Sequence, residues 1–224
     1  MTQTAFLFDL DGTLVDSVYQ HVLAWHEALR GEQIDLPVWL IHKRIGMSDG
    51  QMIAELLRIF DRVPDTALTE RLREGHARVY KTLSETVKPL PGAQALLAHL
   101  DTQQIPWAIA TSGDRDGAKP NLTALGLDPG TIIMVTRSEA RLSKPDPDLF
   151  IQAAGRLNVP TGSTIVVGDS EWDMLAAARC GALGVGLLCG GNGGEELQKS
   201  GAIRIYDDPA ALLANINELA PTTI

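Results

Sequence analysis

Two aspartates separated by one residue follow the first apolar segment of the chain. Asp9 directly follows the segment Ala5–Phe8, and Asp11 and Gly12 follow after one intervening residue. If both carboxylates face one crevice, they repel each other unless a cation or a shared proton lies between them. Mg²⁺ suits such a position because it binds a few carboxylates, keeps water ligands and accepts phosphate oxygens. The pair therefore predicts a magnesium site that can receive a phosphorylated ligand.

Two later segments carry groups that suit the binding of phosphate. Thr111, Ser112 and Gly113 follow the apolar run 107–110, and they offer hydroxyls and a backbone amide to phosphate oxygens. Lys144 precedes a proline near the start of a predicted helix. Its charge can neutralise a phosphate and a nucleophile together.

More acids follow another apolar run. Asp169 comes directly after residues 164–168 and is the best placed to be a further metal ligand, with Glu171 and Asp173 beyond it. Each of the four segments alone could be an ordinary turn or loop. Together they predict a metal-assisted phosphoryl-transfer centre built around a carboxylate nucleophile.

The elements that must position these groups alternate along the chain. Short apolar runs predict buried parallel strands, and amphipathic patterns between them predict helices. The expected strands are 5–8, 107–110, 132–135, 164–167, 184–188 and, more weakly, 203–206, and expected helices are 92–103, 148–157 and 171–180. This alternation predicts an α/β fold with a doubly wound parallel sheet, in which ligands bind beyond the carboxyl ends of the strands.

Residues 17–86 interrupt the alternation, because they show helical periodicity and no strand-like run. Asp16 and Ser17 offer an N-cap for a helix through Arg30, Ser48 can cap a second helix over 51–59, and a third helix is expected over 65–83. We therefore expect an α/β core made of 1–16 and 88–224, with an all-helical cap inserted over 17–87. The alternative is that these helices belong to one continuous α/β layer.

Composition narrows the class of protein. The chain has 224 residues, 45% of them hydrophobic, which is enough to build a sizeable core and excludes a mainly disordered chain. A net charge of −9 without a basic run disfavours nucleic acid and anionic membranes as partners. Two cysteines are too few for a disulfide framework, and neither a signal peptide nor an apolar run of ~18–20 residues is visible. We expect a cytoplasmic protein.

The four motifs, in their order along residues 9–173, resemble those of the haloacid dehalogenase superfamily of phosphohydrolases. The helical insertion resembles the cap of its phosphoglycolate phosphatase and β-phosphoglucomutase branch. The resemblance implies a Rossmann-like core, an aspartyl-phosphate intermediate and a Mg²⁺ cofactor.

The resemblance also implies a role for each matching position. Asp9 would be the nucleophile and Asp11 the general acid and base. Asp9, the backbone carbonyl of Asp11 and Asp169 would hold Mg²⁺. Phosphate binding would fall to Thr111, Ser112 and Gly113, and charge neutralisation to Lys144. Asp173, with Glu171 less certain, would support the metal or the lysine. The chemistry itself requires Asp11 to hold a proton, so its environment is expected to raise its pKa.

Four residues of the predicted cap are candidates for substrate contact: His21, Arg44, Met47 and Asp49. His21 could link the cap to Asp11, although it could equally be a surface or hinge residue. Arg44, Met47 and Asp49 flank a loop that meets substrate in the branch, or they simply pack and cap helices. The other histidines, His76 among them, are expected to be surface or packing residues.

The sequence thus predicts a Mg²⁺-dependent phosphatase of a small phosphorylated metabolite, with the cap selecting the substrate. One alternative is a sugar phosphomutase of the β-phosphoglucomutase type. Asp49 argues against it, because the resembling mutases carry there an arginine that holds a second phosphate. Thr13 also gives the Asp-Gly-Thr of the phosphatases. The other alternative is a non-catalytic phospholigand-binding module. The protein is expected to be a monomer or a homodimer.

Overall fold

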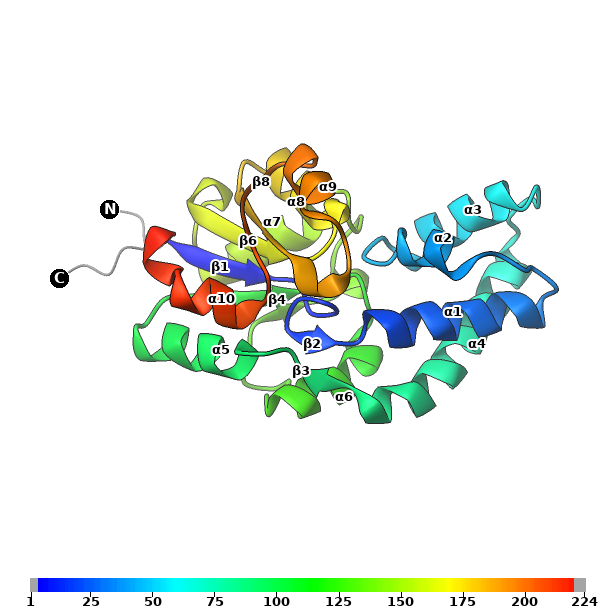
Figure 1. Ribbon diagram of the computed structural model, residues 1–224, viewed down its shortest axis with the longest axis horizontal. Coiled ribbons are helices and arrows are strands. Elements are labelled where there is room, and N and C mark those ends of the chain that lie inside the picture. Colours follow the sequence, from blue (N-terminus) through cyan, green and yellow to red (C-terminus); the bar gives the residue numbers. More distant parts are fainter. Residues whose placement is uncertain (1–3, 220–224) are drawn as a thin grey trace.

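The computed structural model describes residues 4–219, and a six-stranded parallel sheet lies at its centre (Figure 1). The strand order is β5-β4-β1-β6-β7-β8. The strands are β1 Ala5–Phe8, β4 Trp107–Ala110, β5 Met134–Val135, β6 Thr164–Gly168, β7 Leu183–Leu187 and β8 Ala202–Tyr206. The predicted doubly wound α/β fold is confirmed. Residues 1–3, which the expectation of no signal peptide includes, lie outside the described residues.

Strand β1 shows why the sheet is covered on both faces. Phe6 and Phe8 pack on one face in a cluster with α5, α6 and α10, whereas Leu7 packs on the other face with α7 and α8. Successive side chains of a strand point to opposite faces, so a strand buried on both sides reads as one continuous apolar run. The core helices are α5 Ala93–Thr102, α6 Arg115–Leu125, α7 Asp148–Leu157, α8 Glu171–Arg179, α9 Gly194–Lys199 and α10 Pro209–Ala214.

Strand β5 is shorter than predicted. The expected strand covers residues 132–135, but only Met134 and Val135 pair with β4. Ile132 and Ile133 precede this edge strand and are half-buried, and the carbonyl of Ile133 still accepts from the amide of Ile109 at 3.0 Å.

Four helices follow β1 and form a separate body beside the sheet, to which we refer as the cap (Figure 1). They are α1 Val18–Gly31, α2 Val38–His42, α3 Asp49–Ile59 and α4 Thr66–Leu83. Their apolar faces pack in a cluster of their own that includes Trp25, Leu56 and Leu72. The chain enters and leaves the cap through two short antiparallel strands, β2 Val15–Asp16 and β3 Lys88–Pro89. The boundaries 17–87 for an inserted domain stay a prediction.

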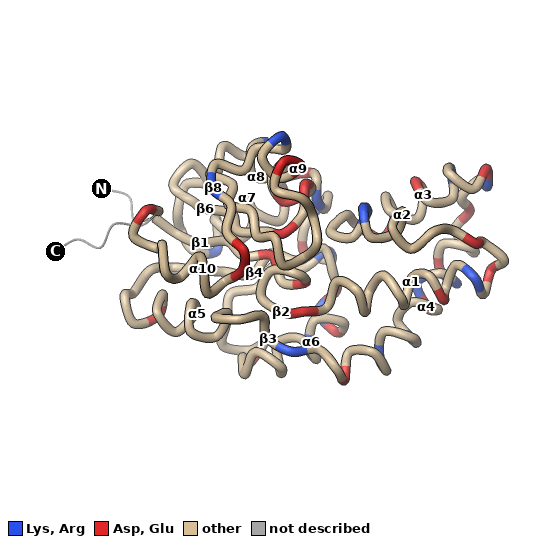
Figure 2. Tube along the Cα trace, in the orientation of Figure 1, with Lys and Arg blue, Asp and Glu red and all other residues tan. Residues whose placement is uncertain are grey.

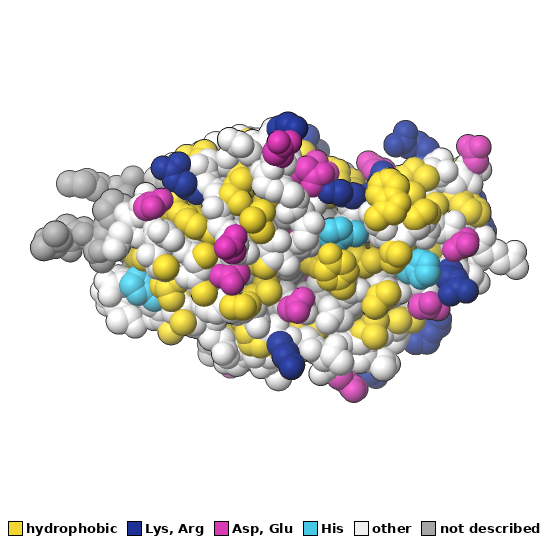
Figure 3. Space-filling view, viewed as in Figure 1, with side chains coloured by type: hydrophobic (Ala, Val, Ile, Leu, Met, Phe, Trp, Pro, Cys, Tyr) yellow, Lys and Arg dark blue, Asp and Glu magenta, His cyan; other side chains and the backbone are white. Residues whose placement is uncertain are grey.

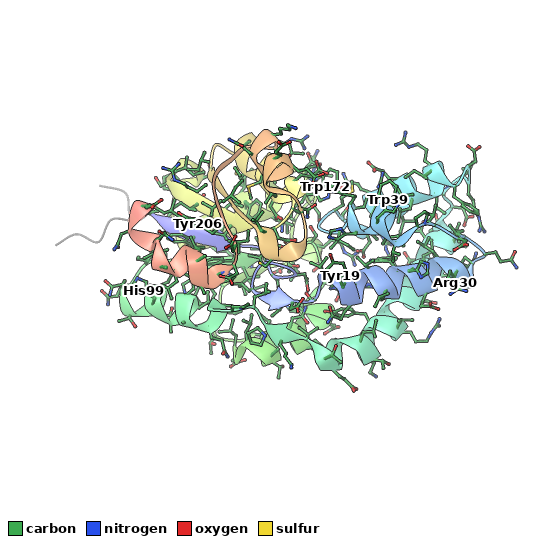
Figure 4. All side chains as sticks on the ribbon, in the orientation of Figure 1. Tyr19, Arg30, Trp39, His99, Trp172 and Tyr206 are labelled. Carbon is green, nitrogen blue, oxygen red and sulfur yellow. The ribbon has the colours of Figure 1, made fainter. Side chains whose placement is uncertain are left out.

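Contacts between the cap and the core are few and polar, apart from one aromatic side chain. Trp172 at the start of α8 packs against the cap cluster, and Figure 4 shows it on the side of the core that faces α2. His42 Nε2 lies 2.9 Å from the carbonyl of Gly190, and Lys43 forms an ion pair of 2.5 Å with Glu196. The cap is therefore attached to the core through side-chain contacts as well as through the double linker.

The outer surface of the cap carries exposed apolar side chains. Tyr19, Leu23, Val38 and Trp39 are each exposed, and Figure 3 shows hydrophobic side chains gathered over α1 and α2. Exposed apolar surface of this kind is where a contact between two copies can form. The expectation of a monomer or a homodimer stays a prediction. Among residues 4–219, no helix is long and apolar enough to cross a membrane.

The separate clusters predict separate effects of core mutations. Replacing the fully buried Leu72 of the cap by alanine removes apolar contacts and leaves a cavity, at a cost of about 2–5 kcal/mol. Hydrogen exchange should then accelerate at amides of α1, α3 and α4 and stay unchanged in β1 and β6. Leu96→Ala, on the sheet side, is the matched control and should show the opposite pattern. Equal acceleration throughout the chain in both variants would show that cap and core unfold as one unit.

Candidate active site

The carboxyl ends of three adjacent strands bring the predicted residues together. β1 lies between β4 and β6, so the segments that follow these strands meet at one edge of the sheet. Asp9 follows β1, Thr111 follows β4 and Asp169 follows β6, and all three line one cavity of about 1020 Å³. Figure 2 shows acidic positions concentrated at this end of the sheet, facing the cap. The convergence that the sequence predicts is thus present.

The loop after β1 is held by its own backbone. The amide of Asp9 donates to the carbonyl of Val167 at 2.9 Å, which extends the pairing with β6. Gly12 adopts a φ of 82°, and its amide donates to the carbonyl of Val15 at 2.8 Å. A Cβ at Gly12 would lie 2.6 Å from a carboxylate oxygen of Asp169. Only glycine therefore allows the loop to turn here and to approach the acid that follows β6.

Lys144 lies fully buried between two carboxylates. Its ammonium group contacts Asp9 and lies 2.8 Å from Asp173. Burial alone would lower the pKa of Lys144, but the charges of Asp173 and Asp9 outweigh burial and raise it. Lys144 is therefore a permanent cation behind Asp9, as the sequence predicts for this position.

Carboxylates outnumber cations around that lysine. Ligand oxygens of Asp9, Asp169 and Asp173 all lie within 4.8 Å of one another, and all three residues are buried. Burial, with the charges of Asp173 and Asp11, raises the pKa of Asp9 to about 7 despite Lys144. Burial, with Asp173 and Asp9, also raises the pKa of Asp169 well above its usual value. One ammonium group cannot balance these charges, so the cluster suits a divalent cation with oxygen ligands such as Mg²⁺.

Some predicted residues lie near that cluster and others do not. Asp173 belongs to it and also accepts from Ser170 Oγ at 2.5 Å in a capping box of α8. Glu171, in the first turn of the same helix, is half-exposed and outside the cluster. The carboxylate of Asp11 is outside the cluster as well. The resemblance implicates only the backbone carbonyl of Asp11 in metal binding.

The carboxylate of Asp11 turns toward the cap instead. Its Oδ1 accepts from Ser17 Oγ and from Asn121 Nδ2, both at 2.6 Å, and lies 3.2 Å from His21 Nε2. Burial opposes ionisation, but the charge and hydrogen bond of His21 and the Ser17 hydroxyl prevail and lower the pKa of Asp11. The expectation of a raised pKa is wrong for this arrangement, because three donors converge on one oxygen. Because the hydroxyl of Ser17 donates to Asp11, its side chain does not cap the N-terminus of α1 as predicted.

His21 continues into a stack of rings on the cap. Its Nδ1 lies 3.0 Å from His76 Nε2, and its ring lies 3.9 Å from that of Tyr80 and 5.2 Å from that of His76. Burial, with the nearby His21, lowers the pKa of His76 to about 2, so His76 stays neutral. The packing role expected for His76 is present, in a stack with Trp25 at 4.2 Å. Its contact with His21 was not predicted.

The segment after β4 approaches the cap from the core side. Ser112 Oγ donates to the carbonyl of Gly46 at 2.9 Å, and the amide of Gly113 donates to Thr111 Oγ1 at 3.0 Å. All three of Thr111, Ser112 and Gly113 line the cavity that Asp9 lines. A phosphate in that cavity would therefore meet hydroxyl groups at the end of β4.

Among the four cap candidates, the structure brings three to the cavity. His21, Met47 and Asp49 line it. Arg44 does not, because its Nε donates to Glu55 at 3.0 Å and its Nη1 to the carbonyl of Leu40 at 2.9 Å. Burial raises the pKa of Asp49, against the charges of two arginines nearby.

Those arginines, Arg137 of the core and Arg73 of the cap, were not singled out from the sequence. Nor was Asn121, which accepts from Tyr80 Oη at 3.0 Å while it donates to Asp11. Asn192 Nδ2 donates to the carbonyl of Asp169 at 3.0 Å and was likewise missed. A single asparagine or arginine carries no local signal of such a role, because only the packing of distant segments brings it close to the site.

Several known proteins are similar to this chain in sequence. A family model described as haloacid dehalogenase-like hydrolase matches residues 3–181. Hexitol phosphatase A of Escherichia coli is 33% identical over 80% of this chain and 82% of the relative. A phosphoglycolate phosphatase of Neisseria meningitidis is 32% identical over 83% of this chain and 80% of the relative.

Solved structures with a similar fold are also known. The crystal structure of a hydrolase from Pseudomonas syringae is 50% identical with a TM-score of 0.96, and the match covers 97% of this chain and 100% of the other. A β-phosphoglucomutase from Clostridium difficile has a TM-score of 0.84 over 97% of this chain and 96% of its own. At 23% identity, the second similarity concerns the fold alone.

The acidic cluster predicts a pH-dependent stabilisation by Mg²⁺. Because the pKa values of Asp9 and Asp169 are raised without a cation, these groups hold protons that a metal must displace. Millimolar Mg²⁺ should therefore raise the melting temperature over that in EDTA, and more at about pH 8 than at about pH 6. The measurement is thermal unfolding at both pH values.

A matched pair of variants tests the assignment of the ligands. Asp169→Asn should lose most of the Mg²⁺-induced shift in melting temperature, whereas Glu171→Gln, outside the cluster, should keep it. Equal shifts in the two variants would place the cation elsewhere.

Proposed function

The chain belongs to the haloacid dehalogenase-like hydrolases and is a phosphoric monoester hydrolase; we propose that it removes phosphate from a small phosphorylated metabolite in a Mg²⁺-dependent reaction. One observation carries the proposal. Asp9 lies at the cavity wall with the buried Lys144 behind it and Asp169 beside it. A buried carboxylate held by a buried lysine at the wall of a cavity is arranged for attack on phosphorus.

In the first step, a carboxylate oxygen of Asp9 attacks the phosphorus of the substrate. A bond forms between that oxygen and phosphorus, and the bond between phosphorus and the ester oxygen breaks. Asp11 gives its proton to the departing oxygen, so that an alcohol leaves and an aspartyl-phosphate remains. The low pKa of Asp11 in the ligand-free arrangement must rise for this step, and the like charge of a phosphate dianion beside it has that effect.

In the second step, the aspartyl-phosphate is hydrolysed. Asp11, now ionised, removes a proton from a water molecule whose oxygen attacks phosphorus. The bond between phosphorus and Asp9 breaks, which restores the carboxylate and yields inorganic phosphate. The hydrogen bonds of Ser17 and Asn121 to Asp11 orient its carboxylate for both proton transfers.

Asp9, Asp169 and the backbone carbonyl of Asp11 are the groups that we propose hold Mg²⁺. When bound, the ion neutralises phosphate oxygens and keeps Asp9 ionised, which its raised pKa otherwise opposes. Lys144 orients Asp9 from behind, and Asp173 holds Lys144 in place. Thr111, Ser112 and Gly113 bind the oxygens of the phosphoryl group.

The cap excludes water and selects the substrate in this proposal. His21, Met47 and Asp49 extend from it into the cavity above the reacting groups. Closing such a cavity strengthens the electrostatic interactions within it. Two curated relatives that bear phosphatase names, at 33% and 32% identity, support a phosphatase over a mutase. The intact set of acids around Lys144 supports an enzyme over a binding module.

Replacing the nucleophile tests the reaction. Asp9→Asn should lower the Mg²⁺-dependent hydrolysis of p-nitrophenyl phosphate by about a thousandfold or more, because an amide cannot form the intermediate. The melting temperature should show that the variant is folded. Retained hydrolysis would contradict the nucleophile, and conversion of a sugar 1-phosphate to a 6-phosphate without phosphate release would indicate the mutase.

Asp11 is tested by the quality of the leaving group. Asp11→Ala should slow the hydrolysis of an alkyl phosphate, which needs a proton, by about 10²–10⁴-fold. It should slow the formation of the intermediate from p-nitrophenyl phosphate much less, since p-nitrophenolate leaves without a proton. The measurement is the pre-steady-state burst of p-nitrophenol, compared with single-turnover hydrolysis of the alkyl ester. Equal losses on both substrates would remove Asp11 from the role of acid.

A further inference from the structure

A row of alternating charges crosses from the core to the cap along the cavity wall. Arg137 of the core contacts Asp49 at the start of α3, and its Nη2 lies 3.7 Å from Asp114. On the cap side, Arg73 Nε lies 3.9 Å from Asp49, and its Nη1 lies 2.6 Å from Glu70. All five side chains line the cavity that Asp9 lines. The two arginines thus face the substrate space already paired with carboxylates.

Backbone hydrogen bonds connect this row to the phosphate-binding segment. The amide of Arg137 donates to the carbonyl of Gly113 at 3.0 Å. Gly46, three residues before Asp49, accepts from Ser112 Oγ at 2.9 Å. Asp49 and Arg137 therefore lie next to the residues that bind the phosphoryl group, where the remainder of a bound substrate must lie.

One polar atom in the row has no partner among the described residues. Arg73 Nε is buried and makes no hydrogen bond, since the 3.9 Å to Asp49 is too long for one. A buried donor of this kind costs free energy unless something accepts from it. The guanidinium-bearing side chain of Arg73 and the carboxylate of Asp49 both line the cavity, so the wall offers donors and an acceptor side by side.

A hydroxyl group matches this pairing and a second anion does not. A hydroxyl can accept from Arg73 and donate to Asp49, because it carries both a proton and lone pairs. A carboxylate or phosphate only accepts, so it would have to compete with Asp49 for both guanidinium groups and would meet the charge of that acid. Asp49 alone would repel a second phosphate, but the two arginines beside it also attract anions, so the charge of Asp49 is only part of the selection.

We propose that Asp49, Arg73 and Arg137 form the subsite for the non-reacting part of the substrate. This subsite selects phosphomonoesters whose non-reacting part is uncharged and bears hydroxyl groups over those that carry a second anionic group. The inference rests on the proposed phosphatase function and names its substrate class. Asp49 is the residue that decides the selection, because it holds both arginines.

Two substrates that differ at one carbon test the selection. Glycerol 3-phosphate and 3-phosphoglycerate share a skeleton and a phosphate, but the first ends in a hydroxymethyl group and the second in a carboxylate. Wild-type enzyme should show a kcat/KM about tenfold or more in favour of glycerol 3-phosphate. Asp49→Asn removes the carboxylate that Arg73 and Arg137 share as an ion partner, and it should shrink that ratio by about tenfold or reverse it. A general loss of activity in the variant lowers kcat/KM for both substrates equally and therefore cancels in the ratio.

Two further variants distinguish the mechanism from a change in overall charge. Adding Arg137→Gln to Asp49→Asn should remove the gain on 3-phosphoglycerate, because the freed guanidinium is what binds the carboxylate. Asp116→Asn removes an exposed acid that also borders the cavity and is paired with Lys119, and it should leave the ratio unchanged. A ratio that Asp116→Asn changes as much as Asp49→Asn does would overturn the inference.

The remaining outcomes are separable. Wild-type enzyme that hydrolyses p-nitrophenyl phosphate but prefers 3-phosphoglycerate, or an Asp49→Asn ratio equal to that of wild type, would overturn the subsite and leave the phosphatase standing. Wild-type enzyme that releases phosphate from none of the three esters in the presence of Mg²⁺ would overturn both.

Discussion

The buried ion pairs of Lys144 are the constraint on which the site depends. Moving an ammonium group out of water is costly, and a fully buried lysine persists only with close, well-oriented partners. Asp9 and Asp173 supply them, but their charges also crowd Asp169. The cluster therefore needs one more cation than the chain provides. Stability and catalysis share this requirement, since the ion that would balance the acids is also the one that would neutralise a phosphate.

Much of this could be predicted because the information is local. A short apolar run followed by acidic or hydroxyl-bearing residues indicates both a buried strand and functional groups at its carboxyl end. Asp9, Thr111 and Asp169 each carry that signal, and the adjacency of β4, β1 and β6 then places them at one edge. Three of the four cap helices were also predicted, and Ser48 and Asp65 cap α3 and α4 with their side chains, whereas the short helix α2 was not predicted. The antiparallel pairing of β2 and β3 was not predicted, because strands of two residues leave no pattern.

The rest depends on distances that no local pattern records. Asn121 lies 110 residues from Asp11 along the chain, yet donates to it at 2.6 Å. Arg137 likewise lies 88 residues from Asp49 along the chain, yet its side chain contacts that of Asp49. The expectation for Asp11 failed for the same reason: its pKa follows from His21 and Ser17, whose positions depend on how α1 leaves the linker. Site residues that act through others are thus the least visible in a sequence.

The hydroxyl of Ser112 connects phosphate binding to the position of the cap. It has one proton, which it donates to the carbonyl of Gly46 on the cap. In the proposed reaction the same proton serves an oxygen of the phosphoryl group, so phosphate binding withdraws a hydrogen bond from the cap. A substrate whose hydroxyls bridge Asp49 and Arg73 replaces that contact with new ones across the cavity. Inorganic phosphate, which has no such hydroxyls, does not. In the proposed reaction, the contacts that such a substrate makes with the cap therefore end once the alcohol has left.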